Sequence, residues 1–293
     1  MSAPKEDELW PRASAWLETA EAGRNYDLGL MGIPAHLTSI SSTNAHTTPA
    51  AIRAALQRYS TFNWSTETDV STLSFADFGD VAEPDSEAGE ARTSQLASHI
   101  SARAGLTIGL GGDNSVTFAM ARGVFGTRIE TAGLITLDAH HDLRDGVNNG
   151  SPVRRLVDEL GLDGRRIVQI GIADFSNSPA YAARAHDLGI HVIPRSALRN
   201  RSMTEVMAEA VSIAGAAGGP VHVDFDVDVC DRSVVPACPA AAPGGISADE
   251  FRQLAFEAGR YSQVRSVDFT EIDASVDTAD GRTVRLAALG ILE

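Results

Sequence analysis

The chain has 293 residues, of which 43% are hydrophobic and 22% charged, enough for one large α/β domain with a sizeable core. Its 39 acidic and 24 basic residues give a formal net charge of −15, which argues against nucleic acid or an anionic membrane as a partner. No apolar run reaches the roughly 18–20 residues that a membrane-spanning helix needs.

The first residues are polar and charged and do not resemble a signal peptide. Two cysteines, Cys230 and Cys238, are too few for a secreted disulfide scaffold, and whether they interact is left open. We therefore expect a cytoplasmic protein with reduced thiols.

Short apolar runs rich in β-branched residues alternate with amphipathic stretches along the whole chain. In chain order the pattern predicts a strand at 26–33, helices at 49–59 and 87–104, a strand at 106–110, a helix at 115–126, a strand at 132–138, a helix at 152–160, a strand at 166–172, a helix at 179–188, a strand at 190–194, a helix at 203–216, a strand at 221–227, a helix at 248–261 and a strand at 264–273. Such alternation predicts a mainly parallel sheet covered by helices, in a single domain spanning 1–293.

Four of these helices have a hydroxyl residue where an N-terminal cap is expected. The first also has proline at its first helical position, where the missing N–H costs nothing. The predicted caps are Thr48, Ser86, Ser202 and Ser247.

Polar side chains follow three of the predicted strands. Asn114 follows the strand at 106–110 in the segment GGDN, and the segment DAHHD (138–142) follows the next strand along the chain. The segment DFDVD (224–228) ends a third strand. Because binding groups gather at the carboxyl ends of parallel strands, we expect these segments to meet in a single crevice.

The segment DAHHD places polar side chains at alternating positions. In an extended strand end, side chains two residues apart share a face. The alternation predicts that Asp138, His140 and Asp142 reach one cluster, while His141 points elsewhere and packs.

The segment DFDVD repeats this spacing with Asp224, Asp226 and Asp228. Several carboxylates on one face repel each other unless a cation lies between them. Carboxylate oxygens together with one imidazole are donors that suit Mn²⁺, whereas thiolate-rich donor sets are typical of zinc or copper. A solvated turn would explain DAHHD alone, and a polar edge strand would explain DFDVD alone. Their joint occurrence, with GGDN upstream, favours a shared metal site.

These segments carry a resemblance to a known family. GGDN, DAHHD, DFDVDVCD and EID (271–273), in this order, resemble the four motif segments of the ureohydrolase superfamily, which contains arginase, agmatinase and formimidoylglutamase. The longer segments DAHHDLRDGVNNGSPVRRL and VQIGIADFSNS are most similar to bacterial formimidoylglutamases. The resemblance implies a three-layer α/β fold, a dinuclear manganese site, a small amidine or guanidine substrate and a homo-oligomer.

The resemblance also implies roles for individual residues. Asp142 would orient the attacking hydroxide as well as bind metal, and Glu271 would face the amidine or guanidine group of the substrate. The implied metal ligands are Asp138 and Asp226 bridging both ions, Asn114 and Asp142 at the first ion, and His140 and Asp228 at the second.

This chain departs from the family at Asn114, where the family has histidine. An amide oxygen is a weaker donor than imidazole, so we expect weaker binding of the first ion. Asn149 stands where arginases have a catalytic histidine, as is usual in formimidoylglutamase-like sequences, and we assign it to substrate binding. Ala274 replaces a frequent proline, a change expected to affect only the stiffness of the loop.

Arg144 lies two residues after Asp142, at the expected rim of the crevice. A guanidinium there suits bidentate capture of a substrate carboxylate. N-formimidoyl-L-glutamate has two carboxylates, whereas agmatine has none. The competing interpretation is a surface salt bridge from Arg144 to Asp145 or Asp158.

Three functions are therefore kept. The leading one is manganese-dependent hydrolysis of N-formimidoyl-L-glutamate to L-glutamate and formamide in histidine degradation. The second is hydrolysis of a guanidino compound by an agmatinase-, guanidinobutyrase- or arginase-like enzyme, which release of urea would distinguish. The third is a non-catalytic homologue with an impaired first metal site, for which Asn114 is the one argument.

Overall fold

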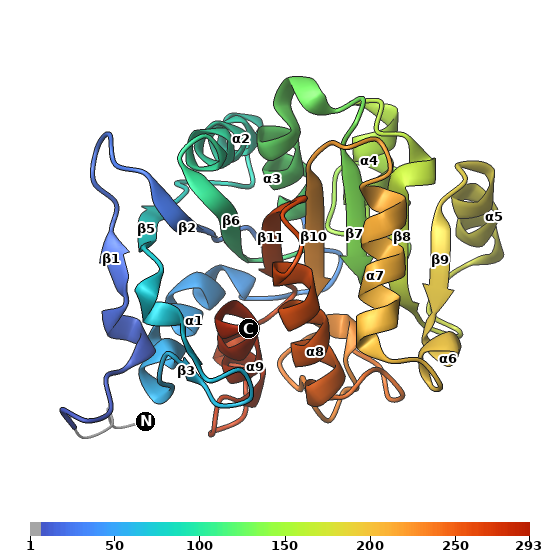
Figure 1. Cartoon of the computed structure of the whole chain (residues 1–293). Coiled ribbons are helices and arrows are strands. Elements are labelled where there is room, and N and C mark those ends of the chain that lie inside the picture. The colour runs from blue at the N-terminus through green and yellow to red at the C-terminus, as the bar shows by residue number, and fades with distance from the viewer. Residues whose placement is uncertain (1–6) are drawn as a thin grey trace.

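The computed structural model describes residues 7–293, and its centre is a nine-stranded sheet in which every neighbouring pair of strands is parallel (Figure 1). The strands of this sheet are β1 (Leu17–Thr19), β2 (Tyr26–Ile33), β5 (Phe75–Asp80), β6 (Ala104–Gly111), β7 (Gly133–Leu137), β8 (Ile167–Ile172), β9 (His191–Pro194), β10 (Val221–Asp226) and β11 (Val264–Thr270). Their order across the sheet is β1-β5-β2-β6-β11-β10-β7-β8-β9. A separate antiparallel hairpin is formed by β3 (Phe62–Asn63) and β4 (Thr68–Asp69).

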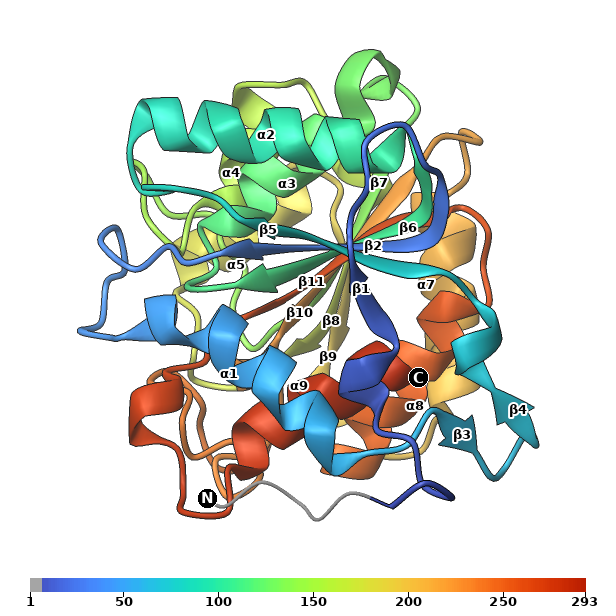
Figure 2. The same ribbon diagram turned by 90° about the vertical axis from the view of Figure 1, so that its left-hand side faces the viewer.

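Helices cover both faces of the sheet. The α-helices are α1 (Thr48–Ala55), α2 (Glu87–Ser101), α3 (Val116–Phe125), α4 (Pro152–Asp158), α5 (Pro179–Asp187), α6 (Arg195–Leu198), α7 (Met203–Ala214), α8 (Ala248–Gly259) and α9 (Arg282–Leu292). Figure 2 shows α2, α3 and α4 on one side and α1, α7, α8 and α9 on the other. This arrangement confirms the predicted three-layer α/β fold with a mainly parallel sheet.

The central strands are buried on both faces, which explains their continuous apolar runs. All five residues of β7 and all six of β8 are buried. On one face, Phe225, Phe251 and Phe269 pack together, with the rings of Phe225 and Phe269 stacked at 5.1 Å. The core therefore holds the strand ends that carry the polar segments rigidly in place.

All seven predicted strands and all seven predicted helices are found, and the helices end one to four residues earlier than expected. The side chains of Ser86, Ser202 and Ser247 accept the predicted capping hydrogen bonds. The prediction for Thr48 is wrong, because this residue begins α1 and its hydroxyl donates to the carbonyl of Ile272.

Several elements were not predicted: β1, β5, the β3–β4 hairpin, α6 and α9. Helix α9 begins after Gly281, which has a left-handed φ of 67° and supplies no capping side chain. The carboxylate that accepts from the N–H groups of Thr283 and Val284 belongs to Asp277, four residues before Gly281. The usual signal, a hydroxyl or carboxylate at the cap position itself, is therefore missing.

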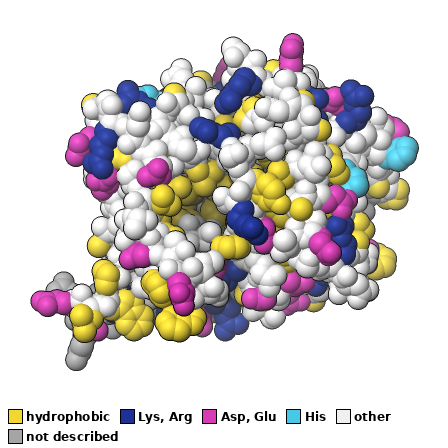
Figure 3. All heavy atoms as spheres, in the orientation of Figure 1, with side chains coloured by type: hydrophobic (Ala, Val, Ile, Leu, Met, Phe, Trp, Pro, Cys, Tyr) yellow, Lys and Arg dark blue, Asp and Glu magenta, His cyan; other side chains and the backbone are white. Residues whose placement is uncertain are grey.

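None of the helices within residues 7–293 is long and apolar enough to span a bilayer. Acidic and basic side chains are interspersed on the face shown in Figure 3, which is hollowed where apolar side chains gather. The first six residues, on which the signal-peptide prediction partly depends, lie outside the described part of the chain. The single-domain assignment of 1–293 likewise stays a prediction.

Candidate active site

The polar segments meet at the carboxyl edge of four adjacent central strands. In the order β6-β11-β10-β7, these strands are followed or ended by Asn114, Glu271, Asp226 and Asp138. All four side chains are buried. The expectation that separate strand ends converge on one crevice therefore agrees with the observed sheet order.

Three side chains form a compact group that suits a metal ion. One ligand atom from each of Asp138, His140 and Asp228 lies within 4.8 Å of the others. Nδ1 of His140 is 2.8 Å from Oδ2 of Asp228 and 3.4 Å from Oδ1 of Asp138. Oδ2 of Asp138 is buried without a hydrogen-bond partner, as a carboxylate oxygen reserved for a cation would be.

Two further carboxylates border this group. Oδ1 of Asp226 accepts a hydrogen bond of 2.8 Å from the backbone N–H of Asp228. Burial and the neighbouring Asp138 raise the pKa of Asp142 well above its ordinary value. Burial, Asp228 and Asp138 do the same to the pKa of Asp226. The site thus gathers four aspartates whose charges need a compensating cation.

The prediction that residues 138–142 continue the strand in an extended conformation is wrong, because strand β7 ends at Leu137. Beyond that point the chain bends, and Asp142 adopts a left-handed φ of 53°. The turn still directs Asp138, His140 and Asp142 to the same site. His141 packs as expected, since it is buried and its Nδ1 lies 2.7 Å from Oε1 of Gln169.

The second acidic segment also differs from an extended strand. Strand β10 ends at Asp226, and a single 3₁₀ turn, Val227–Val229, carries Asp228 to the site. Asp224 lies deeper in the sheet, where its Oδ1 is 3.4 Å from the hydroxyl of Thr270. Burial and the nearby Asp268 raise the pKa of Asp224 well above its usual range. Asp224 therefore does not repeat the role of the other two aspartates.

Asn114 lies inside the site with both ends of its amide engaged. Its Nδ2 donates to Oδ2 of Asp142 at 2.7 Å, while its Oδ1 accepts from the hydroxyl of Thr117 at 2.8 Å and lies 3.2 Å from that of Thr270. The amide is thus oriented by two threonines, neither of which the sequence motifs identify. Its nitrogen, and not its oxygen, faces the neighbouring carboxylate.

Glu271 is held by two N–H donors on the same oxygen. Its Oε1 accepts hydrogen bonds of 2.8 Å from the backbone of Asn114 and from Nδ2 of Asn149. Burial and the charge of Asp113 raise its pKa to about 8. Like Asp142, Glu271 has a left-handed backbone, with a φ of 65°. Strained backbone of this kind clusters at functional sites.

The pKa values of Asp138 and His140 are both raised in the site without a metal. Burial raises the pKa of Asp138 to about 7, with a further contribution from Asp228. Burial opposes a charge on His140, but its hydrogen bonds to Asp138 and Asp228 raise its pKa to about 12. A bound cation would lower the pKa of both Asp138 and His140, because it favours an ionised carboxylate and a neutral ring.

Arg144 lies at the exposed rim, packed over a glycine. A Cβ added at Gly150 would lie 2.7 Å from Cδ of Arg144 and 3.2 Å from Cδ1 of Ile40. Within residues 7–293, the guanidinium of Arg144 makes no ion pair. The expected competitors are engaged elsewhere, Asp145 with Arg184 and Asp158 with Arg154. The surface salt bridge is therefore not observed.

Asn149 connects the rim to the interior of the site. Its Oδ1 accepts a hydrogen bond of 2.9 Å from the backbone of Ile40, and its Nδ2 donates to Glu271. Asn177 has a similar linking role that we did not predict, since it bonds the backbone of Ala139 and of His141. Asn177 could have been found from the sequence because it lies in the segment after β8, and this segment leaves the sheet at the same edge as the other polar segments.

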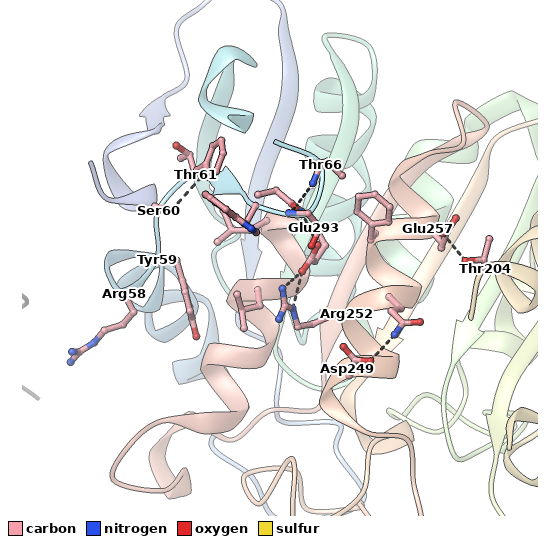
Figure 4. A pocket seen from close by; sticks show the side chains of 18 of the residues that line it. Arg58, Tyr59, Ser60, Thr61, Thr66, Thr204, Asp249, Arg252, Glu257 and Glu293 are labelled. Atoms are coloured by element: carbon pink, nitrogen blue, oxygen red, sulfur yellow. Dashed lines mark hydrogen bonds and ion pairs between the residues drawn. The ribbon is translucent and has the colours of Figure 1, made fainter. Parts of the chain in front are cut away.

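A cavity of about 720 Å³ lies away from these residues, between the hairpin and helices α8 and α9 (Figure 4). Arg252 in this cavity is neutralised by Glu293, whose other oxygen lies 3.4 Å from Nδ2 of Asn63. No carboxylate of the candidate site lines it. The candidate site at the strand edge is therefore separate from this cavity.

Comparison with known proteins identifies the family of the chain. A sequence model of the arginase family matches residues 26–293. The chain is 34% identical to the formimidoylglutamase of Halalkalibacterium halodurans over 279 residues, covering 92% of this chain and 87% of that protein. It is 31% identical to the formimidoylglutamase of Bacillus subtilis over 272 residues, covering 88% and 83%.

Solved structures show the same fold. The crystal structure of formimidoylglutamase from Bacillus subtilis superposes with a TM-score of 0.92 at 28% identity, covering 99% of this chain and 92% of that chain. Formiminoglutamase from Trypanosoma cruzi with Mn²⁺ gives a TM-score of 0.86 at 26% identity, covering 96% of each chain. The chain therefore belongs to the arginase family of hydrolases.

Proposed function

We propose that this hydrolase of amidine C–N bonds converts N-formimidoyl-L-glutamate and water to L-glutamate and formamide, with manganese as its metal. The observation that carries the proposal is Arg144, a guanidinium at the rim of a buried acidic site that makes no ion pair with any residue from 7 to 293. Such a group suits a substrate that carries a cationic amidine at one end and carboxylates at the other. The similarity to two formimidoylglutamases supports the same substrate.

The residues of the site fit manganese. Carboxylate oxygens and one imidazole nitrogen are donors that this ion accepts, and Oδ2 of Asp138 has no other partner. If two ions bind, we propose that Asp138 and Asp226 would be shared between them, that His140 and Asp228 would complete one position, and that Asp142 with Asn114 would complete the other.

Manganese, when bound, acts as a Lewis acid that lowers the pKa of water and so supplies hydroxide near neutral pH. In the proposed mechanism, Asp142 orients this nucleophile and Glu271 binds the substrate amidinium. Since Oε1 of Glu271 already accepts two hydrogen bonds, its other oxygen is left for the substrate. Nearby cations favour the ionised form of Glu271, which charge-assisted hydrogen bonding requires.

The direct test is turnover by the manganese-loaded protein, with products identified by mass spectrometry. Release of L-glutamate and formamide from N-formimidoyl-L-glutamate is the expected result. Release of urea from 4-guanidinobutyrate or agmatine, without turnover of N-formimidoyl-L-glutamate, would replace this function by a guanidino-compound hydrolase. Homo-oligomerisation stays a prediction that sedimentation would test.

Replacing Arg144 by alanine is expected to raise KM for N-formimidoyl-L-glutamate much more than it lowers kcat. The contact with a carboxylate is present in ground and transition states alike, so its loss mainly weakens binding. A charged hydrogen bond of this kind contributes about 1.5–3 kcal/mol. Steady-state kinetics with formamidine, which has no carboxylate, provide the substrate control.

The matched variant is Arg165→Ala, because Arg165 is an exposed arginine paired only with Asp163 within the described residues. It should leave both kinetic constants unchanged. An unaltered KM in Arg144→Ala would show that the carboxylate is bound elsewhere.

Replacing Asn114 by histidine is expected to increase manganese occupancy at the first position. Imidazole is a stronger donor than an amide oxygen, and the oxygen of Asn114 is already occupied by Thr117 and Thr270. The wild-type protein should therefore purify with less than two ions and gain activity on addition of Mn²⁺. Titration of both proteins, read by metal analysis, is the measurement, and equal affinities would show that Asn114 does not weaken the site.

A further inference from the structure

The loop that follows β8 contains a strained aromatic residue beside the candidate site. Among residues 7–293, five non-glycine residues have a left-handed φ, and two of these, Asp142 and Glu271, belong to the site. A third is Phe175, with a φ of 66°. A bulky residue in this region of backbone space is a genuine outlier and needs a cause.

The cause of the strain is the anchoring of the loop to the turn 138–142. The backbone N–H of Ala173 donates to the carbonyl of Ala139 at 3.1 Å. Asn177 then donates to that carbonyl at 2.9 Å and accepts from the N–H of His141 at 3.0 Å. The loop is thus fixed on both sides of His140, and Phe175 lies between its two anchors.

The ring of Phe175 gains no internal contact in return for this strain, because its side chain is fully exposed. Other large apolar side chains are exposed on segments following β2, β7 and β11, at the same edge of the sheet. They are Leu37, Ile40, Val147 and Val276. Exposed apolar side chains therefore occur on several of the segments that leave the edge of the sheet where the acidic residues lie, and Ile40 among them donates its backbone N–H to Asn149.

We propose that Phe175 is a specificity-determining residue that packs on the hydrocarbon chain of the substrate where this chain leaves the metal site. The inference rests on the proposed function, because it takes the substrate to be an amidine joined to a carboxylate by an aliphatic chain. The anchored loop fixes the backbone of Phe175, so little backbone freedom is lost when the ring makes this contact.

The test compares Phe175→Asn and Phe175→Leu with the wild type, all loaded with manganese. Asparagine tolerates the left-handed backbone but removes the ring, whereas leucine keeps an apolar side chain. Phe175→Asn should raise KM for N-formimidoyl-L-glutamate about tenfold, equivalent to about 1.4 kcal/mol. It should leave KM for formamidine, which lacks the chain, unchanged, and Phe175→Leu should recover most of the loss.

The matched control is Glu67→Asn, which relieves the same kind of strain in the β3–β4 hairpin, where φ is 52°. Both asparagine variants should keep or raise the melting temperature, and only Phe175→Asn should change KM. Unchanged KM in Phe175→Asn overturns the proposal. So does a shift in sedimentation with unchanged KM, because the ring would then belong to a contact between copies of the chain.

Failure of the proposed function gives a different result. The wild type could instead hydrolyse 4-guanidinobutyrate or 3-guanidinopropionate and not N-formimidoyl-L-glutamate. The same variants are then compared on that compound, which also has an aliphatic chain, and Phe175→Asn should raise its KM. If the wild type turns over none of them, the thermal shift caused by L-glutamate decides, since Phe175→Asn should then lose that shift and Glu67→Asn should keep it.

Discussion

The Asp138→Ala variant is expected to lose both manganese ions and nearly all activity. One ligand atom of Asp138 lies within 4.8 Å of ligand atoms of His140 and Asp228, and its Oδ2 has no hydrogen-bond partner among residues 7–293. In the proposed assignment Asp138 is shared by both ions, so its loss should affect both, whereas loss of a terminal ligand should affect mainly one ion. Breaking a buried ionic cluster costs about 3–5 kcal/mol, so metal affinity should fall by roughly two to four orders of magnitude.

Metal analysis after dialysis is the measurement, with His140→Ala as the comparison. His140→Ala should retain about one ion for each chain, because the proposed second position alone loses a ligand. An exposed carboxylate on α5, removed in Asp187→Ala, controls for a nonspecific loss of negative charge. Two retained ions in Asp138→Ala would contradict the shared-ligand assignment.

The metal-free protein is expected to become less stable as the pH rises from about 5 to 8. Burial raises the pKa of Asp138 to about 7 and that of Glu271 to about 8 in the folded state, well above their ordinary values. Groups with a raised folded pKa stabilise the fold fully below their unfolded pKa, and this contribution is lost as the pH rises through the folded pKa. The raised pKa of His140 acts in the same direction.

Manganese should reverse this trend, since it binds the ionised carboxylates and its affinity grows with pH. At a free concentration 100 times its dissociation constant, a ligand adds about 2.7 kcal/mol to stability. Each kcal/mol raises the melting temperature by roughly 2–4 °C in a chain of this size class. Thermal unfolding with EDTA and with Mn²⁺ across this pH range is the measurement.

The matched variant is Asp138→Asn, which should flatten the pH dependence without metal and reduce the gain from Mn²⁺. A melting temperature of the metal-free protein that rises between pH 6 and pH 8 would contradict the assignment of these carboxylates to one buried cluster.

The sheet, its parallel direction and the convergence of the polar segments were predictable from the sequence. Each follows from an apolar run ending in polar residues, a local pattern that the chain repeats at β6, β7 and β10. The position of Asp224 was not predictable, because it depends on how far the strand continues. A strand that ends at Asp226 leaves Asp224 facing its neighbour β11, where Asp268 lies directly opposite.

The orientation of Asn114 and the strain at Phe175 were also beyond the sequence. Asn114 is turned by the hydroxyls of Thr117 and Thr270, and Thr270 comes from a strand 156 residues further along. The backbone of Phe175 is set by two anchors on a different loop, and its own side chain favours another conformation. Contacts of this kind between distant segments leave no local periodicity to detect.

The strand order also governs when the site comes into existence during synthesis. Strands β6 and β7 follow one another along the chain, yet β11 and β10 separate them in the sheet. A nascent chain that has emerged only as far as β9 therefore lacks the two central strands and the ligands at their ends. Such long-range strand insertion is slow to fold. Under the proposed ligand assignment, metal capture would await the emergence of β10, which is followed by Asp228, so a shorter chain on the ribosome would expose Asp138 without Asp226 and Asp228.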